Sequence, residues 1–105
     1  MKIELAKKET IHFIGIGGIG MSGLSLVMKA KGFKIQGSDI AINKNIEKLK
    51  KQNVKVFVGH KKQNIKNVTI VVISSAIKKN NPELIEAQRK KLPIITRGKM
   101  LANLV

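Results

Sequence analysis

Short apolar runs alternate along this chain with stretches in which apolar residues recur at helical spacing. The apolar runs occupy positions 11–15, 33–36, 54–58, 68–73 and 93–95. The stretches with helical spacing occupy positions 18–31, 43–53, 81–90 and 96–105. Strands that alternate with helices are typical of a parallel sheet with helices on both faces. The pattern predicts a doubly wound α/β domain of about five strands, for which right-handed crossovers favour the order 3-2-1-4-5.

The first helix is expected to begin at Gly18 or Ile19 and to end at Lys31, where Gly32 stops it. Burial of one apolar stripe should hold this helix against the sheet. The expected stripe contains Ile19, Gly23, Leu26 and Ala30, widened by Met21, Leu24 and Met28.

The third helix has a well-defined start. Asn81 is a suitable N-cap, Pro82 suits the first helical position, and Glu83 places an acid in the first turn. Further along, Glu86 and Lys90 are spaced to pair on the helix surface.

The predicted strand order places a ligand site. Strands one and four are neighbours in that order, and the topology switches between them. Ligands of such sheets bind at this switch, at the carboxyl ends of the strands. The glycine turn after strand one and the Ser74-Ser75-Ala76 turn after strand four should therefore face each other.

The turn after strand one carries the G-x-G-x-x-G spacing, with Gly15, Gly17 and Gly20. Such glycines let the backbone approach a pyrophosphate, and the amides and positive end of the following helix stabilise its charge. Asp39 follows strand two, where Rossmann-like domains place the acid that binds ribose hydroxyls. A tight turn without a ligand and a plain surface aspartate are the alternatives.

Other polar residues near the predicted site allow two interpretations each. Ser74 and Ser75 offer hydroxyls and amides to a ligand or simply end a strand. His12 lies inside strand one, where it is either a core residue or a ligand contact. His60 follows strand three and either reaches a nucleotide or is solvated. No spacing suggests metal ligands or a Ser/His/Asp triad, so the domain is expected to bind without a catalytic centre of its own.

The net charge is the unusual bulk property. The chain has 21 Lys and Arg residues and 6 Asp and Glu residues, which gives a formal net charge of +15. Such a charge favours anionic partners of any kind. A lysine-biased solvent face explains it equally well, because the lysines are spread over nearly every segment. Proteins that bind single-stranded nucleic acid usually stack bases on exposed aromatics. Here Phe13, Phe33 and Phe57 all lie in apolar runs, so no nucleic-acid partner is expected.

The uncharged stretch 11–28 raises the question of a membrane segment. Its many glycines favour a turn and disfavour a membrane-spanning helix or the apolar region of a signal sequence. The chain has no cysteine, which excludes disulfides and thiolate metal sites and fits a reducing compartment. A cytoplasmic protein with no membrane partner is therefore expected.

Six stretches, taken together, are more specific than the G-x-G-x-x-G spacing alone: 11–24, 37–39, 59–60, 71–77, 81–83 and 93–101. In order and spacing they resemble the amino-terminal domain of the Mur ligases of peptidoglycan synthesis. The resemblance is strongest to the branch that joins L-alanine to UDP-N-acetylmuramic acid. The Gly-Met-Ser-Gly segment at 20–23 and the Ser-Ser-Ala-Ile turn at 74–77 separate the chain from nicotinamide-binding domains.

The resemblance implies that residues 1–105 form a domain that binds the UDP part of UDP-N-acetylmuramic acid, not NAD. The site residues that it implies are Gly17, Gly18, Ile19 and Gly20 for the diphosphate, Asp39 and His60 toward the uridine, Ser74 and Ser75 on the opposite wall, and Asn81 and Arg97 near the sugar-phosphate end. One departure is Lys99, which stands where the family usually has an acid. With Thr96 as N-cap, that acid would complete a capping box, whereas Lys99 weakens the helix start.

In such ligases ATP and magnesium activate the substrate carboxylate as an acyl phosphate, which the amine of L-alanine attacks. The resemblance implies that central and C-terminal domains, absent from these residues, carry out this step. No P-loop motif occurs in the sequence. These residues alone are therefore expected to bind substrate but not to catalyse, and to hold no metal or cofactor. An NAD- or nucleotide-sensing regulatory domain is the main alternative, and a basic nucleic-acid binder is a third.

Overall fold

The computed structural model describes residues 8–104, in which strands alternate with helices as the sequence pattern predicts. The strands are β1 (Thr10–Ile14), β2 (Lys34–Asp39), β3 (Lys55–Val58), β4 (Ile70–Ile73) and β5 (Ile94–Thr96). The helices are α1 (Ile19–Ala30), α2 (Lys44–Lys51), α3 (Pro82–Arg89) and α4 (Arg97–Asn103), with a short 3-10 helix η1 (Lys62–Ile65) after β3. Across this described range, none of the helices has the length and apolar character that a bilayer span requires.

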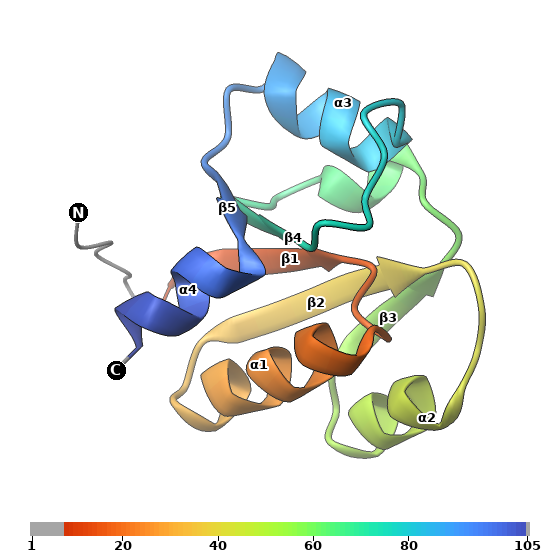
Figure 1. Cartoon of the computed structure of the whole chain (residues 1–105), viewed down its shortest axis with the longest axis vertical. Helices are drawn as coiled ribbons and strands as arrows, with labels where there is room; N and C mark the ends of the chain where they lie inside the picture. Colours follow the sequence, from red (N-terminus) through yellow and green to blue (C-terminus); the bar gives the residue numbers. More distant parts are fainter. Residues whose placement is uncertain (1–7, 105) are drawn as a thin grey trace.

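The strands run parallel in one sheet, in the order β3-β2-β1-β4-β5 (Figure 1). This order confirms the predicted one. β1 lies at the centre, where Ile11 is in register with Ile35 of β2 and with Ile70 of β4. β2 continues to Asp39, beyond its predicted end at Gln36, because β1 and β3 pair with it on both sides. The carboxyl ends of β1 and β4 therefore form the topological switch point at which such sheets bind ligands.

Each face of the sheet has its own hydrophobic core. The larger one lies under α1, α2 and α4 and includes Phe13 and Met28 (Figure 1). The smaller one lies under α3 and η1 and includes Ile14 and Leu84. Full burial of a side chain such as Phe13 contributes about 1.5–3 kcal/mol. Because strand residues alternate between faces, His12 lies on the same face as Ile14, toward α3.

The predicted buried stripe of α1 is confirmed for Met21, Leu24 and Met28 and was wrong for Ile19, Gly23 and Ala30. Ile19 is 93% exposed and Ala30 is also exposed, whereas Met21 and Met28 are buried. Ser25 is buried on the sheet side as well, which is possible because its hydroxyl donates to the Ser22 carbonyl of the same helix at 2.7 Å. The predicted stripe did not allow for serines that satisfy their hydroxyls on the backbone of their own helix.

The start of α3 confirms the predicted cap. The Asn81 Oδ1 accepts hydrogen bonds from the Glu83 and Leu84 amides at 2.9 and 3.3 Å. The expected pair of Glu86 with Lys90 is present at 3.9 Å. A second cation lies closer, because Arg89 donates to both carboxylate oxygens of Glu86 at 2.8 Å.

Candidate functional site

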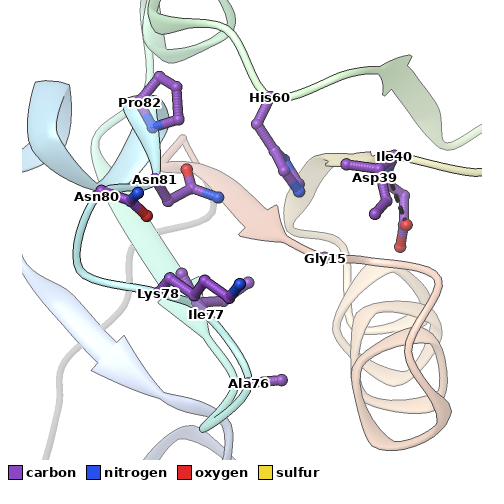
Figure 2. Close-up of a pocket in the computed structure, with 10 residues that line it drawn as sticks. All are labelled: Gly15, Asp39, Ile40, His60, Ala76, Ile77, Lys78, Asn80, Asn81 and Pro82. Carbon is purple, nitrogen blue, oxygen red and sulfur yellow. Dashed lines mark hydrogen bonds between the residues drawn. The ribbon is translucent and has the colours of Figure 1, made fainter.

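A cavity of about 500 Å³ lies at the carboxyl ends of the central strands (Figure 2). Its wall is formed by the ends of β1 and β2, by the loop after β3, and by the segment that joins β4 to α3. The lining residues are Gly15, Asp39, Ile40, His60, Ala76, Ile77, Lys78, Asn80, Asn81 and Pro82. This is the crevice that the strand order predicts, and its volume suits a small-molecule ligand.

Backbone and side-chain hydrogen bonds hold the glycine turn between β1 and α1. Gly15 has φ +82°, which favours glycine, and its amide donates to the Ser38 carbonyl at 2.8 Å. The Gly17 amide donates to the Asp39 Oδ2 at 2.8 Å, and the Asn45 side chain donates to the Gly17 carbonyl at 3.0 Å. A Cβ on Gly17 would lie 2.8 Å from both Asp39 Oδ2 and Ile46 Cδ1, so a side chain at this position would displace these two side chains.

The first turn of α1 differs from the starts of the other α-helices in residues 8–104. Asn43, Asn81 and Thr96 cap α2, α3 and α4 through side-chain oxygens, whereas Gly18 gives α1 no side-chain cap. Within the described residues, the first three helical amides of α1, those of residues 19–21, have no acceptor. Unpaired amides at the positive end of a helix form a site for an anion.

Arg97 lies against the same helix start. It is the first residue of α4, directly after β5, and a Cβ placed on Gly20 would lie 2.8 Å from its Nε. Among the described residues of the first turn of α1 there is no acid. The predicted residues Gly18, Ile19, Gly20 and Arg97 are thus brought together as an exposed, positively polarised surface.

Asp39 supports the glycine turn and also lines the cavity. Its Oδ2 accepts from the Gly17 amide, and its Oδ1 accepts from the Ile40 amide at 2.8 Å. The half-buried carboxylate therefore ties the end of β2 to the turn, while it remains beside the cavity. Gly17 itself is buried, so its amide is already used inside the protein.

The wall opposite the glycine turn begins after the two predicted serines. The Ser74 Oγ accepts from the Ala76 amide at 3.3 Å, and Ser75 is exposed. Neither serine lines the cavity, whereas the next residues, Ala76, Ile77 and Lys78, do. Asn81 completes this wall, and Figure 2 shows its amide nitrogen directed toward the cavity while its oxygen caps α3. Ser74 holds the turn that presents this wall, through the bonds that it accepts from the Ala76 and Ile77 amides.

A buried carboxylate that sequence reasoning missed lies behind the cavity. Glu83, in the first turn of α3, is completely buried. Its Oε1 accepts from His12 Nε2 at 2.7 Å and from Ser38 Oγ at 2.5 Å. Its Oε2 accepts from Asn64 Nδ2 at 2.7 Å and from the Lys61 amide at 3.1 Å. One side chain of α3 therefore joins β1, β2, the loop after β3 and η1.

The hydrogen bonds of this network decide between the two interpretations that the sequence left open for each histidine. His12 is a core residue whose Nδ1 faces the Gln36 side-chain nitrogen at 2.9 Å. His60 lines the cavity, and its Nδ1 lies 2.8 Å from Ser38 Oγ. The sequence offered one signal for the His12–Glu83 pair. A histidine lies inside an apolar strand, and an acid lies far along the chain at a helix start. Spacing alone does not connect the two positions.

Burial opposes ionisation of Glu83, but hydrogen bonds from His12, Ser38 and Asn64 outweigh it and lower its pKa below the ordinary 4.5. A carboxylate with a lowered pKa contributes stability that is complete above pH 4.5 and is lost as the pH falls through its lower folded value.

We expect the unfolding free energy to fall with acidification below pH 4.5, by about 1.4 kcal/mol per pH unit for each proton taken up. Glu83→Gln should reduce this slope, because the amide does not ionise. Glu86→Gln should reduce it less, because the hydrogen bond from Arg89 also lowers the pKa of Glu86 but solvent screens this pair at the surface. Urea denaturation at a series of pH values measures the slopes. Equal slopes in the wild type and in Glu83→Gln would contradict the assignment.

The five-stranded parallel sheet is that of a doubly wound α/β domain. Its glycine turn and uncapped helix start lie at the switch point, where nucleotide-binding domains place their phosphate-binding turn. The chain belongs to the Mur ligase family. The protein-family model described as "Mur ligase family, catalytic domain" matches residues 10–105 of the sequence.

Sequence and structure comparisons with known proteins support the assignment to this family. Over its whole length the chain is 69% identical to a UDP-N-acetylmuramate–L-alanine ligase of Pelagibacter ubique and spans 23% of that protein. It is 57% identical to the enzyme of that name from Rickettsia typhi, with 98% of the chain and 22% of the relative covered. A solved UDP-N-acetylmuramate–alanine ligase from Thermotoga maritima superposes with a TM-score of 0.87 at 33% identity, covering 90% of this chain and 22% of that one. These comparisons confirm the predicted resemblance to the amino-terminal domain of the Mur ligases, and the chain spans about a fifth of these relatives.

Proposed function

We propose that this domain binds the UDP part of UDP-N-acetylmuramic acid, as the substrate-holding domain of a UDP-N-acetylmuramate–L-alanine ligase. The observation that carries the proposal is the α1 start, where helical amides without an acceptor among residues 8–104 lie beside Arg97, in the turn whose first residue, Gly15, lines the cavity. The names of the relatives supply the identity of the substrate.

The diphosphate is assigned to the amides of Ile19 and Gly20 and to the guanidinium of Arg97. The amides of Gly17 and Gly18 lie in the same turn but already donate to Asp39 Oδ2 and to the Gly15 carbonyl. Their role is to hold the turn in shape. A hydrogen bond to a charged group contributes about 1.5–3 kcal/mol, and the dipole of α1 adds to it.

The nucleoside is assigned to the cavity, between Asp39 and His60 on one wall and Asn81 on the other. Asp39 lies where the acid of a nucleotide-binding domain meets ribose hydroxyls. The amide nitrogen of Asn81 offers a donor from the opposite wall (Figure 2). Ser74 acts on the ligand indirectly, through the turn that positions Ala76 and Ile77, whereas Ser75 is exposed and does not line the cavity.

The ligation itself is assigned to further domains of a longer, cytoplasmic enzyme of cell-wall synthesis. ATP and magnesium activate the substrate carboxylate there, and L-alanine attacks it. Residues 8–104 contain no group of three or more His, Asp or Glu side chains suited to a metal ion. To these residues we assign the binding and orientation of the substrate.

A nicotinamide-binding domain is the second candidate, because the glycine spacing and Asp39 also fit it. Shikimate dehydrogenase from Aquifex aeolicus shares the fold with a TM-score of 0.57 at 16% identity, a likeness of fold alone. Both carboxylate oxygens of Asp39 already accept backbone amides here. Because the ribose of UDP carries the same diol as that of NAD, Asp39 favours neither candidate.

Calorimetric titration of the chain with UDP-N-acetylmuramic acid, NADH and a short DNA duplex separates the candidates. We expect UDP-N-acetylmuramic acid to bind with one site per chain and the other two not to compete with it. Preferential binding of NADH would overturn the proposal, and a salt-dependent preference for the duplex would support a nucleic-acid binder.

A further inference from the structure

The Ser38 hydroxyl connects His60, at the cavity, to the buried carboxylate of Glu83, whose Oε1 also lies 3.7 Å from the His60 Nδ1. The Ser38 Oγ donates its hydrogen to Glu83 Oε1 at 2.5 Å. A hydroxyl has a single hydrogen, so at the His60 Nδ1, 2.8 Å away, Ser38 Oγ acts as the acceptor. The Nδ1 of His60 therefore carries a hydrogen.

The buried His12 takes the opposite form. Its Nε2 donates to Glu83 Oε1, which as a carboxylate oxygen only accepts. Its Nδ1 accepts from the Gln36 side-chain nitrogen, which also donates to the Asn64 carbonyl at 2.9 Å. His12 is thus held neutral with its hydrogen on Nε2, and it gives the His60 ring an internal reference within the same chain.

The second ring nitrogen of His60 is available to a ligand. The side chain of His60 is 15% exposed, and Figure 2 shows its ring directed into the cavity between Asn81 and Asp39. Among residues 8–104, no protein group bonds to Nε2. With Nδ1 hydrogenated, Nε2 keeps its lone pair and accepts a hydrogen bond.

We propose that Glu83, acting through Ser38, holds His60 with its hydrogen on Nδ1, so that Nε2 accepts a hydrogen bond from an N–H or O–H group of the bound nucleoside. The identity of the ligand rests on the proposed function. Glu83 and Ser38 are positioning residues, because neither lines the cavity. An imidazole in water exchanges between its two neutral forms, whereas here the acceptor is prepared before the ligand arrives.

Nitrogen-15 NMR of the whole chain reads the position of the hydrogen directly, with His60→Asn to assign the signals. We expect a pyrrole-type Nδ1 and a pyridine-type Nε2 for His60, and the reverse for His12. Ser38→Ala should leave His60 exchanging between both forms and weaken UDP binding roughly tenfold, the effect of one hydrogen bond. The matched control is Ser25→Ala, an equally buried serine of α1 outside the site, which should change neither.

Each readout decides a separate point. A pyridine-type Nδ1 on His60 in the wild type would overturn the relay even if Ser38→Ala did not fold. A His60 that stays fully Nδ1-hydrogenated in folded Ser38→Ala would overturn the part of Ser38. Altered His60 signals with unchanged UDP affinity would overturn the role of Nε2 in binding. Failure of the wild type to bind UDP would instead overturn the proposed function, while the NMR signals still decide the relay.

Discussion

Glu83→Ala should destabilise the domain by about 3–5 kcal/mol, the usual cost of removing one partner of a buried charged network. The substitution removes the acceptor of four hydrogen bonds from different parts of the fold. It leaves the His12 Nε2 as a buried donor without a partner, which costs about 1–3 kcal/mol, whereas the Asn64 side chain keeps its bond to the Gly59 carbonyl at 3.1 Å. Because small domains are stable by only about 5–15 kcal/mol, the variant should be close to unfolding at room temperature.

Urea denaturation followed by far-ultraviolet circular dichroism measures this effect, and the same helix provides the control. Glu86 lies one turn further along α3, where it pairs with Arg89 on the surface. Surface ion pairs of this kind contribute little to stability, so Glu86→Ala should keep a midpoint near that of the wild type. Glu83→Ala should unfold at a much lower urea concentration. Equal midpoints for the two variants would show that Glu83 is an ordinary first-turn acid.

The fold was predictable from the sequence because each local signal agreed with the global arrangement. The alternating runs indicate a parallel sheet, and the handedness of crossovers leaves few strand orders. The Asn81-Pro82 start of α3 and the placement of Asp39 at the end of β2 depend on adjacent residues. Local chemistry of this kind can be read from a sequence without knowing what lies across the fold.

The rest of the site depends on contacts between distant segments. Glu83 has the sequence context of a helix-cap acid, and nothing near it indicates that His12 and Ser38 point at it from two strands. The exposure of Ile19 was missed for a similar reason. An apolar residue at the start of a helix normally packs on the sheet, but this turn lies at the open switch point of the fold.

The exposed position of Ile19 allows one helical amide to be removed with little other change. Proline is favoured at the first helical position, lacks the N–H, and has its φ already set for a helix. Gly18 precedes it with φ −63° and ψ 154°, a conformation that suits a residue before proline. Ile19→Pro therefore deletes a proposed diphosphate donor, while the lost side chain was 93% exposed.

Ile19→Ala is the matched control, because it removes the same side chain but keeps the N–H. Both variants should fold with a urea midpoint close to that of the wild type, since no buried contact is lost. The loss of a hydrogen bond to a charged phosphate costs about 1.5–3 kcal/mol, or roughly 10- to 150-fold in affinity. The difference between the two variants isolates the amide from the side chain.

The decisive measurement is a calorimetric titration of Ile19→Pro and Ile19→Ala with UDP, at one salt concentration. If the amides at the start of α1 hold the diphosphate, Ile19→Ala binds nearly as the wild type does and Ile19→Pro binds at least about tenfold more weakly. If the two variants bind UDP with equal affinity, the diphosphate does not lie at this helix start, and the account of the site is wrong.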